Sequence, residues 1–523
     1  MELALSDEQR MIQASAERFL AQVASSAEVR TAMASEQGYN PSTWARIAGE
    51  LYWPALAIPE AYGGLGLSFV EVCLLQEQLG RRLLPSAFYA TCCLALPALL
   101  LSRNEPLKTH WLPLIAAGEV TASLAYASAP RWDDTAVQVY AQSCAGGYRL
   151  NGQYLHVIDG ADCDVLIIAA RTPGSVGEAG IRLFAIAANT PGVERHSQPT
   201  LDQTRRLATV SLNDVQLHDE HLLSEPGQGW PMLRDVLRIG CIGLAAEQTG
   251  GAQQSMDMTL SYINGREQFG RRIASFQAIK HRCADLMLAL ECARSASYYA
   301  ACIAAQCLDI DGDPAAQQQL GEAAATAKIH ASEGFFHCAA ESIQLHGGVG
   351  FTWEYDPHLY FKRARASEHA AEPAPEPEPE PLPAAMPATG LALEWLEMFP
   401  KLPVSGMTAS IGANCTLIAV DGDDWLLHLD PAHSALFNLT QQRRLNDALN
   451  QFTQRTLKVT IELVKPEQET PAQAAARFRA ERQRLAEESI YADPLVQQMV
   501  EQFGAVVRED TIQPVEVAQA QAS

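Results

Sequence analysis

The chain has 523 residues and a formal net charge of −23, from 38 basic and 61 acidic side chains. That length predicts three or four domain-sized units. The charge argues against a protein whose whole surface grips a phosphate backbone, because such binding needs clustered Lys and Arg. We therefore expect no direct contact with nucleic acid.

The N-terminal residues include acids where a secretion signal carries bases. The longest apolar stretch, residues 91–101, is too short to span a bilayer and contains Pro97. Twelve cysteines lie scattered without a C-x-x-C pair, which is typical of reduced thiols. These features predict a cytoplasmic protein without a membrane partner.

The first three predicted domains follow from hydrophobic periodicity. Residues 1–118 carry helical spacing, with Met11, Ile12, Phe19 and Leu20 on one face of an expected helix over 6–23. Residues 119–222 hold short apolar runs at 120–126, 164–170 and 181–187, separated by Gly, Pro, Asn and Asp, which predict a β domain. Helical patterns return in long segments over 223–370.

A composition change marks the next boundary. Residues 371–390 alternate Glu and Pro, which prevents a helix and predicts a stiff, extended spacer. Residues 391–523 then predict a small α+β domain. Its expected strands lie at 415–420, 425–429 and 457–463, with a turn over 421–424 and helices over 441–452 and 471–489.

Three sequence motifs stand out before the spacer: Ile58–Gly66, Tyr262–Gly270 followed by Phe276–Gln277, and Ile343–Phe351. In this order around a β domain, they resemble the flavin-dependent acyl-CoA dehydrogenase family over residues 1–370. The resemblance implies a helical N-domain, a small β-barrel domain and a helical bundle. It also implies FAD as cofactor, an acyl-CoA substrate, electron-transfer flavoprotein as electron acceptor, and at least a dimer.

The FAD pyrophosphate needs cationic or backbone N–H partners. Arg266, which we expect near a helix end at Gly270, can supply a cation, and paired glycines allow a close backbone approach. In isolation Arg266 is equally a surface cation and Gly347-Gly348 equally a helix C-cap. The resemblance implies that Arg266, Gln268, Phe269 and Gln277 contact FAD, and that Gln344, Gly347 and Gly348 reach the same cofactor from a neighbouring subunit.

Two departures from the family pattern bear on activity. The motif that normally contacts the edge of the flavin ring is replaced here by residues 127–134, in which only Ser128 is a candidate contact. The helix that family members continue past His369 gives way to Glu-Pro repeats, which implies a loss of packing.

The family's chemistry requires a carboxylate that takes the α-proton of the acyl thioester, and burial raises the pKa of such a group toward the working pH. This chain has no Glu-Gly-Thr word of the kind that carries the base in many members. Glu247, an acid among small and apolar residues on a helix, is the first candidate, with a solvated or capping role as its alternative. Glu368 is the second candidate, although its charged neighbours favour a surface position.

The last domain carries words at 425–431, 441–449, 469–471, 493–498 and 512–515 that resemble the C-terminal domain of the DNA polymerase III tau subunit. In that family the domain binds the polymerase catalytic subunit and has no chemistry of its own. Arg477, Arg479, Arg482 and Arg484 favour a solvated, salt-bridged helix face over a nucleic-acid site. No G-x-x-x-x-G-K-[ST] phosphate loop occurs, so the clamp loader's ATPase part is absent.

Two functions therefore compete for the whole chain. The first is an FAD-dependent acyl-CoA dehydrogenase joined to a non-catalytic tau-like interaction domain. The second is a replication-associated interaction protein that carries a degenerate, inactive dehydrogenase fold. An accidental joining of the two parts is a third reading, and a sister subunit that completes the site would make a hetero-oligomer.

Overall fold

A computed structural model of the chain describes residues 5–369 apart from 130 and 310–311, and residues 388–490 with gaps at 403, 405, 431–438, 467, 476, 478–480, 483 and 485–489. The chain divides into two units, Met1–Glu376 and Pro377–Ser523, which are described separately below. In the described residues, no helix combines the length and apolarity needed to cross a bilayer.

The first unit begins with short helices that side chains cap. Ser6, Ser25 and Ser68 each accept a backbone N–H at a helix N-terminus, and each belongs to a capping box. The expected helix over 6–23 is present, but Met11 is 64% exposed and does not share the buried face of Phe19 and Leu20. The helices are α1 (Asp7–Val23), α2 (Ser26–Ala34), α3 (Pro41–Gly49), α4 (Phe69–Arg82), a π-helical segment (Tyr89–Ala95), α5 (Leu96–Leu101) and α6 (Glu105–Ala116).

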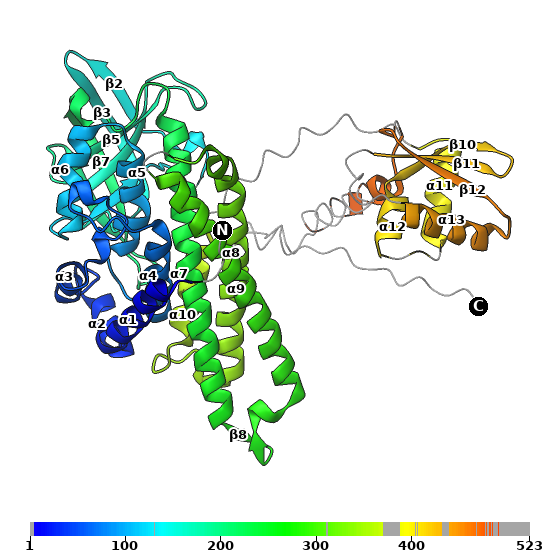
Figure 1. The fold of residues 1–523 in the computed structure, drawn as a ribbon, viewed down its shortest axis with the longest axis horizontal. Helices are drawn as coiled ribbons and strands as arrows, with labels where there is room; N and C mark the ends of the chain where they lie inside the picture. The colour runs from blue at the N-terminus through cyan, green and yellow to red at the C-terminus, as the bar shows by residue number, and fades with distance from the viewer. Residues whose placement is uncertain are drawn as a thin grey trace. The chain divides into compact units, whose positions relative to one another are not determined.

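A seven-stranded sheet follows, in the order β1-β4-β2-β3-β7-β6, with β5 paired to β4. Every residue of β4 is buried, which explains why its first six residues, 165–170, form a continuous apolar run rather than an alternating one. Figure 1 shows this sheet beside the N-terminal helices. The strands are β1 (Ala122–Ala125), β2 (Tyr140–Cys144), β3 (Gly147–Ile158), β4 (Val165–Arg171), β5 (Ile181–Ala187), β6 (Val193–Gln198) and β7 (Leu207–Leu217).

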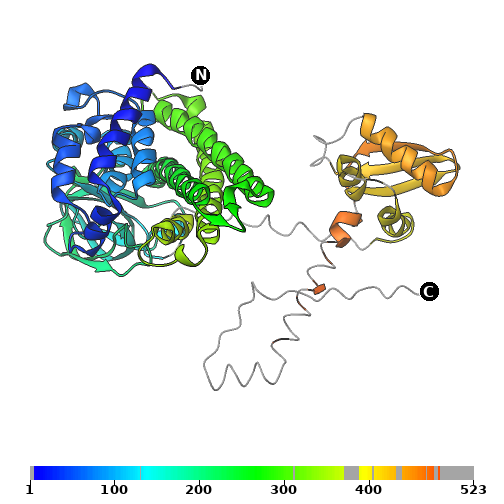
Figure 2. The ribbon, with the colours of Figure 1, turned by 90° about the horizontal axis from the view of Figure 1, so that it is seen from below.

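Long helices complete the first unit: α7 (Gly229–Gly265), α8 (Gln277–Leu308), α9 (Pro314–His346) and α10 (Pro357–His369). They lie against the N-terminal helices in both Figure 1 and Figure 2. Helix α7 crosses α4 closely at Gly250, whose lack of a side chain permits the approach. A Cβ added there would lie 1.8 Å from the carbonyl oxygen of Glu77. Because the two helices touch here, the side chain of Glu247, one turn before Gly250, lies against α4.

The expected helix end at Gly270 was wrong, because α7 stops at Gly265. The chain then makes a hairpin of β8 (Glu267–Gln268) and β9 (Arg271–Arg272). Its two turn residues, Phe269 and Gly270, have φ of 54° and 73°, which a continuing helix does not allow.

The C-terminal end of α10 is held by a buried cation. Lys328 on α9 is 3% exposed and donates to the backbone carbonyl of Glu368 at 3.0 Å and to Ser332 Oγ at 2.7 Å. A cation at this end of a helix interacts favourably with the helix dipole.

The second unit is an α+β fold built on a three-stranded sheet in the order β10-β11-β12. The predicted turn joins β10 and β11 antiparallel, while β11 and β12 are parallel. Trp395 is fully buried and donates its indole N–H to the carbonyl of Gly412 at 3.2 Å. The elements are α11 (Leu391–Met398), α12 (Gly406–Ala413), β10 (Cys415–Asp421), β11 (Asp424–Leu429), α13 (Leu439–Thr453) and β12 (Lys458–Leu463).

Of the helix expected over 471–489, residues 471–475 are helical and much of the rest lies outside the described residues. Most of the 371–390 spacer and all of the words after residue 490 also lie outside them.

Candidate functional site

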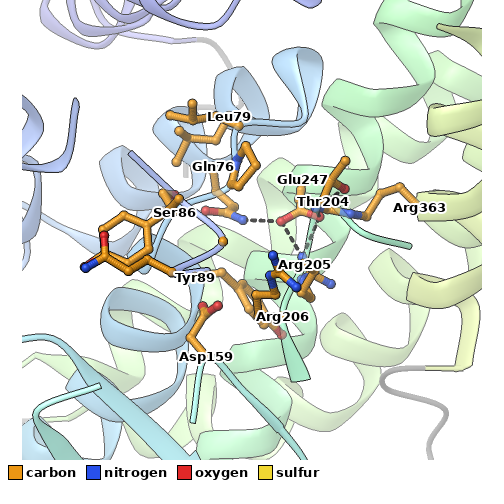
Figure 3. A pocket seen from close by; sticks show the side chains of 15 residues that line it. Gln76, Leu79, Ser86, Tyr89, Asp159, Thr204, Arg205, Arg206, Glu247 and Arg363 are labelled. Atoms are coloured by element: carbon orange, nitrogen blue, oxygen red, sulfur yellow. Dashed lines mark hydrogen bonds and ion pairs between the residues drawn. The ribbon is translucent and has the colours of Figure 1, made fainter. Parts of the chain in front are cut away.

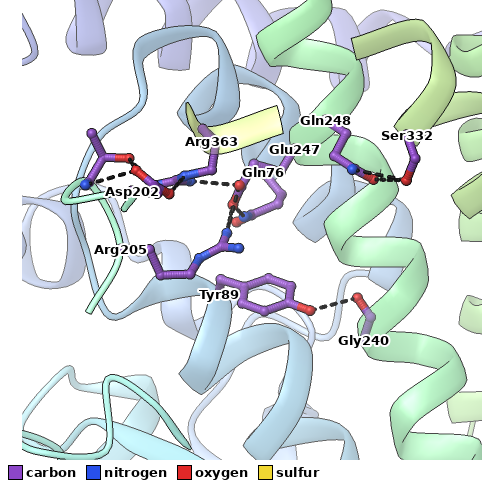
Figure 4. Close-up of polar contacts among 10 residues, drawn as sticks. Gln76, Tyr89, Asp202, Arg205, Gly240, Glu247, Gln248, Ser332 and Arg363 are labelled. Carbon is purple, nitrogen blue, oxygen red and sulfur yellow. Dashed lines mark hydrogen bonds and ion pairs between the residues drawn. The ribbon is translucent and has the colours of Figure 1, made fainter. Parts of the chain in front are cut away.

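Glu247 lies on the part of α7 that crosses α4, and its side chain is almost fully buried. Arg205, from the loop between β6 and β7, donates from Nη2 to both carboxylate oxygens at 2.6 Å. Arg363 on α10 donates from Nη1 to Oε1 at 2.7 Å, and Gln76 on α4 donates from Nε2 to Oε2 at 2.6 Å. Three donors from three separate elements therefore hold one carboxylate (Figure 4).

The two arginines are held in turn by other groups. Arg363 bonds Asp202 through Nε at 2.5 Å and Thr204 through Nη2 at 2.6 Å. Arg205 lies over the ring of Tyr89, with its Cζ 5.0 Å from the ring centroid. We call Asp202, Arg205, Glu247 and Arg363 the buried charge network.

The expectation that the buried carboxylate of Glu247 has a raised pKa was wrong. Burial does act to raise this pKa, but the charges of Arg205 and Arg363 and their hydrogen bonds outweigh burial, and the pKa is lowered. Burial acts to lower the pKa of Arg363, but the charges of Asp202 and Glu247 and their hydrogen bonds outweigh burial, and the pKa is raised. Glu247 is thus an ionised, fully bonded carboxylate.

A small cavity of about 30 Å³ lies beside the network (Figure 3). That volume suits a water molecule rather than an acyl chain. Its lining includes Gln76, Tyr89, Asp159, Arg205, Glu247 and Arg363.

Asp159 is a second carboxylate at this cavity, and sequence reasoning missed it. It follows the last residue of β3 with φ of 53°, so that its position resembles an ordinary turn. Burial raises the pKa of Asp159 to about 7, against the opposing charges of Arg205 and Arg363. The only signal in the sequence was an acid next to Gly160, which is an ordinary turn pattern.

A larger cavity of about 330 Å³ lies between α1, α4, α7 and α8, with mostly apolar walls. The ion pair of Glu77 and Arg294 forms its main charged feature. None of the candidate residues from the sequence lines it.

The other two acid and hydroxyl candidates lie elsewhere. Glu368 is half-buried in the last turn of α10 and pairs with Arg365 at 2.6 Å on the surface. Ser128 donates its hydroxyl to the carbonyl of Gln153 at 2.6 Å on the β domain.

The remaining candidates gather at one end of the long helices. The ring of Tyr262, near the end of α7, stacks on that of His346, at the end of α9, with centroids 4.3 Å apart. The hairpin after α7 and the Gly347-Gly348 turn after α9 therefore belong to the same end. We call this the bundle-end surface, and it comprises the exposed residues Arg266, Gln268, Phe269, Gln277, Gln344, Gly347 and Gly348.

The bundle-end surface fits a dinucleotide pyrophosphate in charge and in access. Within the described residues, Arg266, Arg271 and Arg272 have no ion-pair partner, although the chain as a whole is strongly acidic. A Cβ built at Gly347 or Gly348 would meet no atom within 4 Å, so a ligand can approach this backbone. Gly347 also acts as the C-cap of α9, so that the capping alternative holds as well.

The charge network and the bundle-end surface are far apart in one chain. Glu247 and Arg266 are separated by 266 − 247 = 19 residues, all but the last in α7. At a rise of 1.5 Å per residue this corresponds to about 28 Å along the helix.

Comparison with known proteins finds three matching domain models, two of which belong to one family. Residues 6–119 match "Acyl-CoA dehydrogenase, N-terminal domain", and residues 227–371 match "Acyl-CoA dehydrogenase, C-terminal domain". Residues 385–512 match "DNA polymerase III tau subunit V interacting with alpha".

Individual relatives agree with the first two matches. The acyl-CoA dehydrogenase IpdE2 of Mycobacterium tuberculosis is 34% identical over 69% of this chain and 92% of its own length. Subunit CarC of the caffeyl-CoA reductase-Etf complex of Acetobacterium woodii is 28% identical over 59% and 80%. The butyryl-CoA dehydrogenase of Megasphaera elsdenii shares the fold, with a TM-score of 0.65 and 24% identity over 71% of this chain and 96% of that one.

Proposed function

We propose, from the premise that this chain belongs to the acyl-CoA dehydrogenase family, that it oxidises the Cα–Cβ bond of an acyl-CoA thioester. The observation that carries this proposal is the bundle-end surface. There the family's cofactor-binding residue types stand exposed, cationic and accessible at one end of α7 and α9.

FAD is the cofactor in this proposal, and bound FAD supplies the acceptor for the β-hydrogen and its two electrons. Arg266 binds the pyrophosphate as a cation, while the glycine pair lets backbone approach it. Gln268, Phe269, Gln277 and Gln344 border the same ligand, and Ser128 is the one candidate at the ring edge.

The distance between the two sites supports an assembly of at least two chains. A flavin ring near Glu247 joins its own pyrophosphate through a ribityl chain much shorter than the roughly 28 Å to Arg266. We therefore propose that the whole bundle-end surface serves the flavin of a neighbouring subunit, either a second copy or a sister chain. The family resemblance had assigned only Gln344, Gly347 and Gly348 to that neighbour.

Glu247 is the first candidate for the base in this proposal, and Glu368 is the second. Three hydrogen-bond donors and two arginine charges keep Glu247 ionised, which is the form a base requires. The same contacts weaken it as a proton acceptor, because a strong acid is a weak base. Glu368 is tied to the surface charge of Arg365.

An absorbance test decides the proposal. Purified full-length chain should show the visible spectrum of bound flavin, and butyryl-CoA or isovaleryl-CoA should bleach it under anaerobic conditions. Electron-transfer flavoprotein should then restore the oxidised spectrum, and the name of the CarC relative, an Etf-complex subunit, supports this choice of acceptor. Protein that takes up FAD but shows no bleaching with either thioester would contradict a dehydrogenase.

The second unit is proposed to bind the polymerase catalytic subunit, and the match over 385–512 supports this. The competing function is a replication-associated interaction protein with an inactive dehydrogenase fold. Two features of the site support it. Glu247 is fully bonded, and the cavity beside it measures only about 30 Å³. A colourless protein that captures the polymerase catalytic subunit would favour this alternative.

A further inference from the structure

We propose that the larger cavity of the first unit, between α1, α4, α7 and α8, binds a small neutral molecule that has an apolar body and one hydroxyl group. The cavity measures about 330 Å³. An apolar cavity of about 150 Å³ binds benzene, so a chain of about eight to ten carbons suits a cavity of roughly twice that volume. The site is separate from the proposed dehydrogenase chemistry and does not depend on it.

The cavity and the buried charge network lie on different faces of the same two helices. On α4, Gln76 donates to Glu247 of the network, while its neighbour Glu77 lines the cavity. On α7, the residue before Glu247, Ala246, also lines the cavity. The two helices meet backbone to backbone between these faces, since a Cβ added at Gly80 would lie 2.1 Å from the carbonyl oxygen of Glu247. A ligand in the larger cavity is therefore kept apart from the small cavity beside the network.

The inner wall of the larger cavity is apolar. Helix α4 packs against each of α1, α7 and α8 (Figure 1). Cys73, Leu74, Ala246 and Ala301 line the cavity from these helices, and each is at most 5% exposed. Ser295 on α8 also lines it but is exposed, so the cavity reaches the protein surface at that side. The wall therefore favours a hydrocarbon body that enters from solvent.

One acceptor oxygen among these walls is available to a hydroxyl group. Arg294 donates to Oε1 of Glu77, and in the described part of the chain Oε2 of Glu77 receives no hydrogen bond. The hydroxyls of Thr249 and Ser297, which line the same cavity, pair with each other at 3.2 Å. A ligand hydroxyl can donate to Oε2 of Glu77 while its apolar body lies against the inner wall.

The charges at the cavity are already matched, which favours a neutral ligand over a charged one. Besides Glu77, Arg294 donates from Nη2 to Gln253 at 2.6 Å and from Nε to Glu291 at 3.4 Å. All three nitrogens of its guanidinium group are engaged, so a ligand carboxylate would have to displace one of these partners. A ligand ammonium group would compete with Arg294 for Glu77 and lie beside a like charge. A hydroxyl group leaves the ion pair intact.

Calorimetric titration of the full-length chain with 1-octanol tests the site. We expect one saturable site per chain, with a dissociation constant of about 0.1 to 1 mM, which is usual for a ligand of this size. Octanoate and octylammonium carry the same chain on a charged head group and should bind at least about 10-fold more weakly, because the matched ion pair offers them no partner. Absence of saturable octanol binding, or equal binding of all three compounds, would overturn the proposal.

Ala301→Leu locates the bound octanol. The larger side chain occupies part of the cavity, so octanol affinity should fall at least about 10-fold, while added apolar contacts should keep or raise the melting temperature. The matched control is Ala284→Leu, the same change at an exposed position of α8 that does not line the cavity, and it should bind octanol as the parent does. An Ala301→Leu chain that binds octanol as tightly as the parent would place the ligand elsewhere and overturn the assignment.

Glu77→Gln tests the head-group contact and provides the decisive variant if Ala301→Leu does not fold. The substitution keeps the shape of the side chain but removes the carboxylate partner of Arg294. Octanoate should then bind at least about 10-fold more tightly than it binds the parent, because its carboxylate can take the position of the missing one. Glu291→Gln removes the exposed carboxylate beside Arg294 and should keep the parent's preference for octanol. An octanoate affinity that Glu77→Gln leaves unchanged would overturn the proposed site.

Discussion

Glu247→Gln tests the buried charge network directly, since it removes one charge and keeps the size of the side chain. The parent carboxylate receives N–H groups from Arg205, Arg363 and Gln76. A Gln amide offers one acceptor oxygen and turns an N–H toward a donor. The variant therefore removes the carboxylate partner of Arg205, while Arg363 keeps its ion pair with Asp202.

The cost can be estimated from the geometry. Removing one partner of a buried ion pair costs about 3–5 kcal/mol, because the other charge stays buried without compensation. Arg363 keeps Asp202 at 2.5 Å, so we expect the lower end, about 3 kcal/mol. For domains of moderate size this corresponds to a fall in melting temperature of roughly 6–10 °C.

The matched control is Glu341→Gln, which makes the same chemical change in an exposed pair. Glu341 and Arg282 lie 3.1 Å apart, with side chains 32% and 51% exposed. Such pairs contribute at most about 1 kcal/mol. Differential scanning calorimetry of both variants and parent, at equal flavin content, measures the difference.

The pH dependence supplies a further check on the same variant. The pKa of Glu247 is lowered from its ordinary value of 4.5, so its stabilisation is fully present above that pH and is lost as pH falls through the folded-state pKa. The gap between parent and variant should narrow as pH falls below 4.5, where the parent carboxylate becomes protonated. A Glu247→Gln chain that melts within 1 °C of the Glu341→Gln control at pH 7 would refute the reasoning.

Three other outcomes follow from the structure. The folded-state pKa of Asp159 is about 7 against an ordinary 3.8, so the free energy of unfolding of the parent falls as pH rises between these values, by at most about 4 kcal/mol. In urea titrations, the free energy of unfolding of D159N should therefore increase relative to that of the parent over this pH interval. A difference between the two that does not change with pH would contradict the raised pKa. Arg266→Gln should weaken FAD binding by roughly 10- to 100-fold, since charge-assisted hydrogen bonds contribute about 1.5–3 kcal/mol; equilibrium dialysis measures this, with Arg282→Gln as the control that should retain FAD. Trp395→Ala should destabilise the second unit by about 3–5 kcal/mol and leave the first unit's melting transition in place, because each unit has its own core; a shift of both transitions would contradict independent folding.

The fold class was predictable because its signals are local. The predicted strands at 164–170 and 181–187 are mostly apolar runs bounded by turn residues, and the structure has β4 at Val165–Arg171 and β5 at Ile181–Ala187. The family's fold and the tau-like match were likewise readable from short words, and the comparisons confirm both. The end of α7 was not predictable from periodicity, because a two-residue turn at Phe269 and Gly270 overrides the helical pattern.

The chemistry of the candidate site depended on contacts that no local pattern contains. Glu247 was singled out correctly as a buried acid, but its arginine partners lie 42 and 116 residues away in sequence. Those partners reverse the direction of its pKa. Asp159 was overlooked for the opposite reason, since an Asp-Gly pair after a strand is an ordinary turn signal. The roles proposed for Glu247 and for the bundle-end surface stay predictions.

The bond from Lys328 to the carbonyl of Glu368 bears on how two such different units came to share one chain. The ammonium group of Lys328 satisfies one of the last carbonyls of α10, and its charge offsets the helix dipole. The end of α10 is therefore anchored by a residue of the first unit itself. Replacing everything after His369 by an unrelated tethered cargo should consequently leave the flavoprotein half intact.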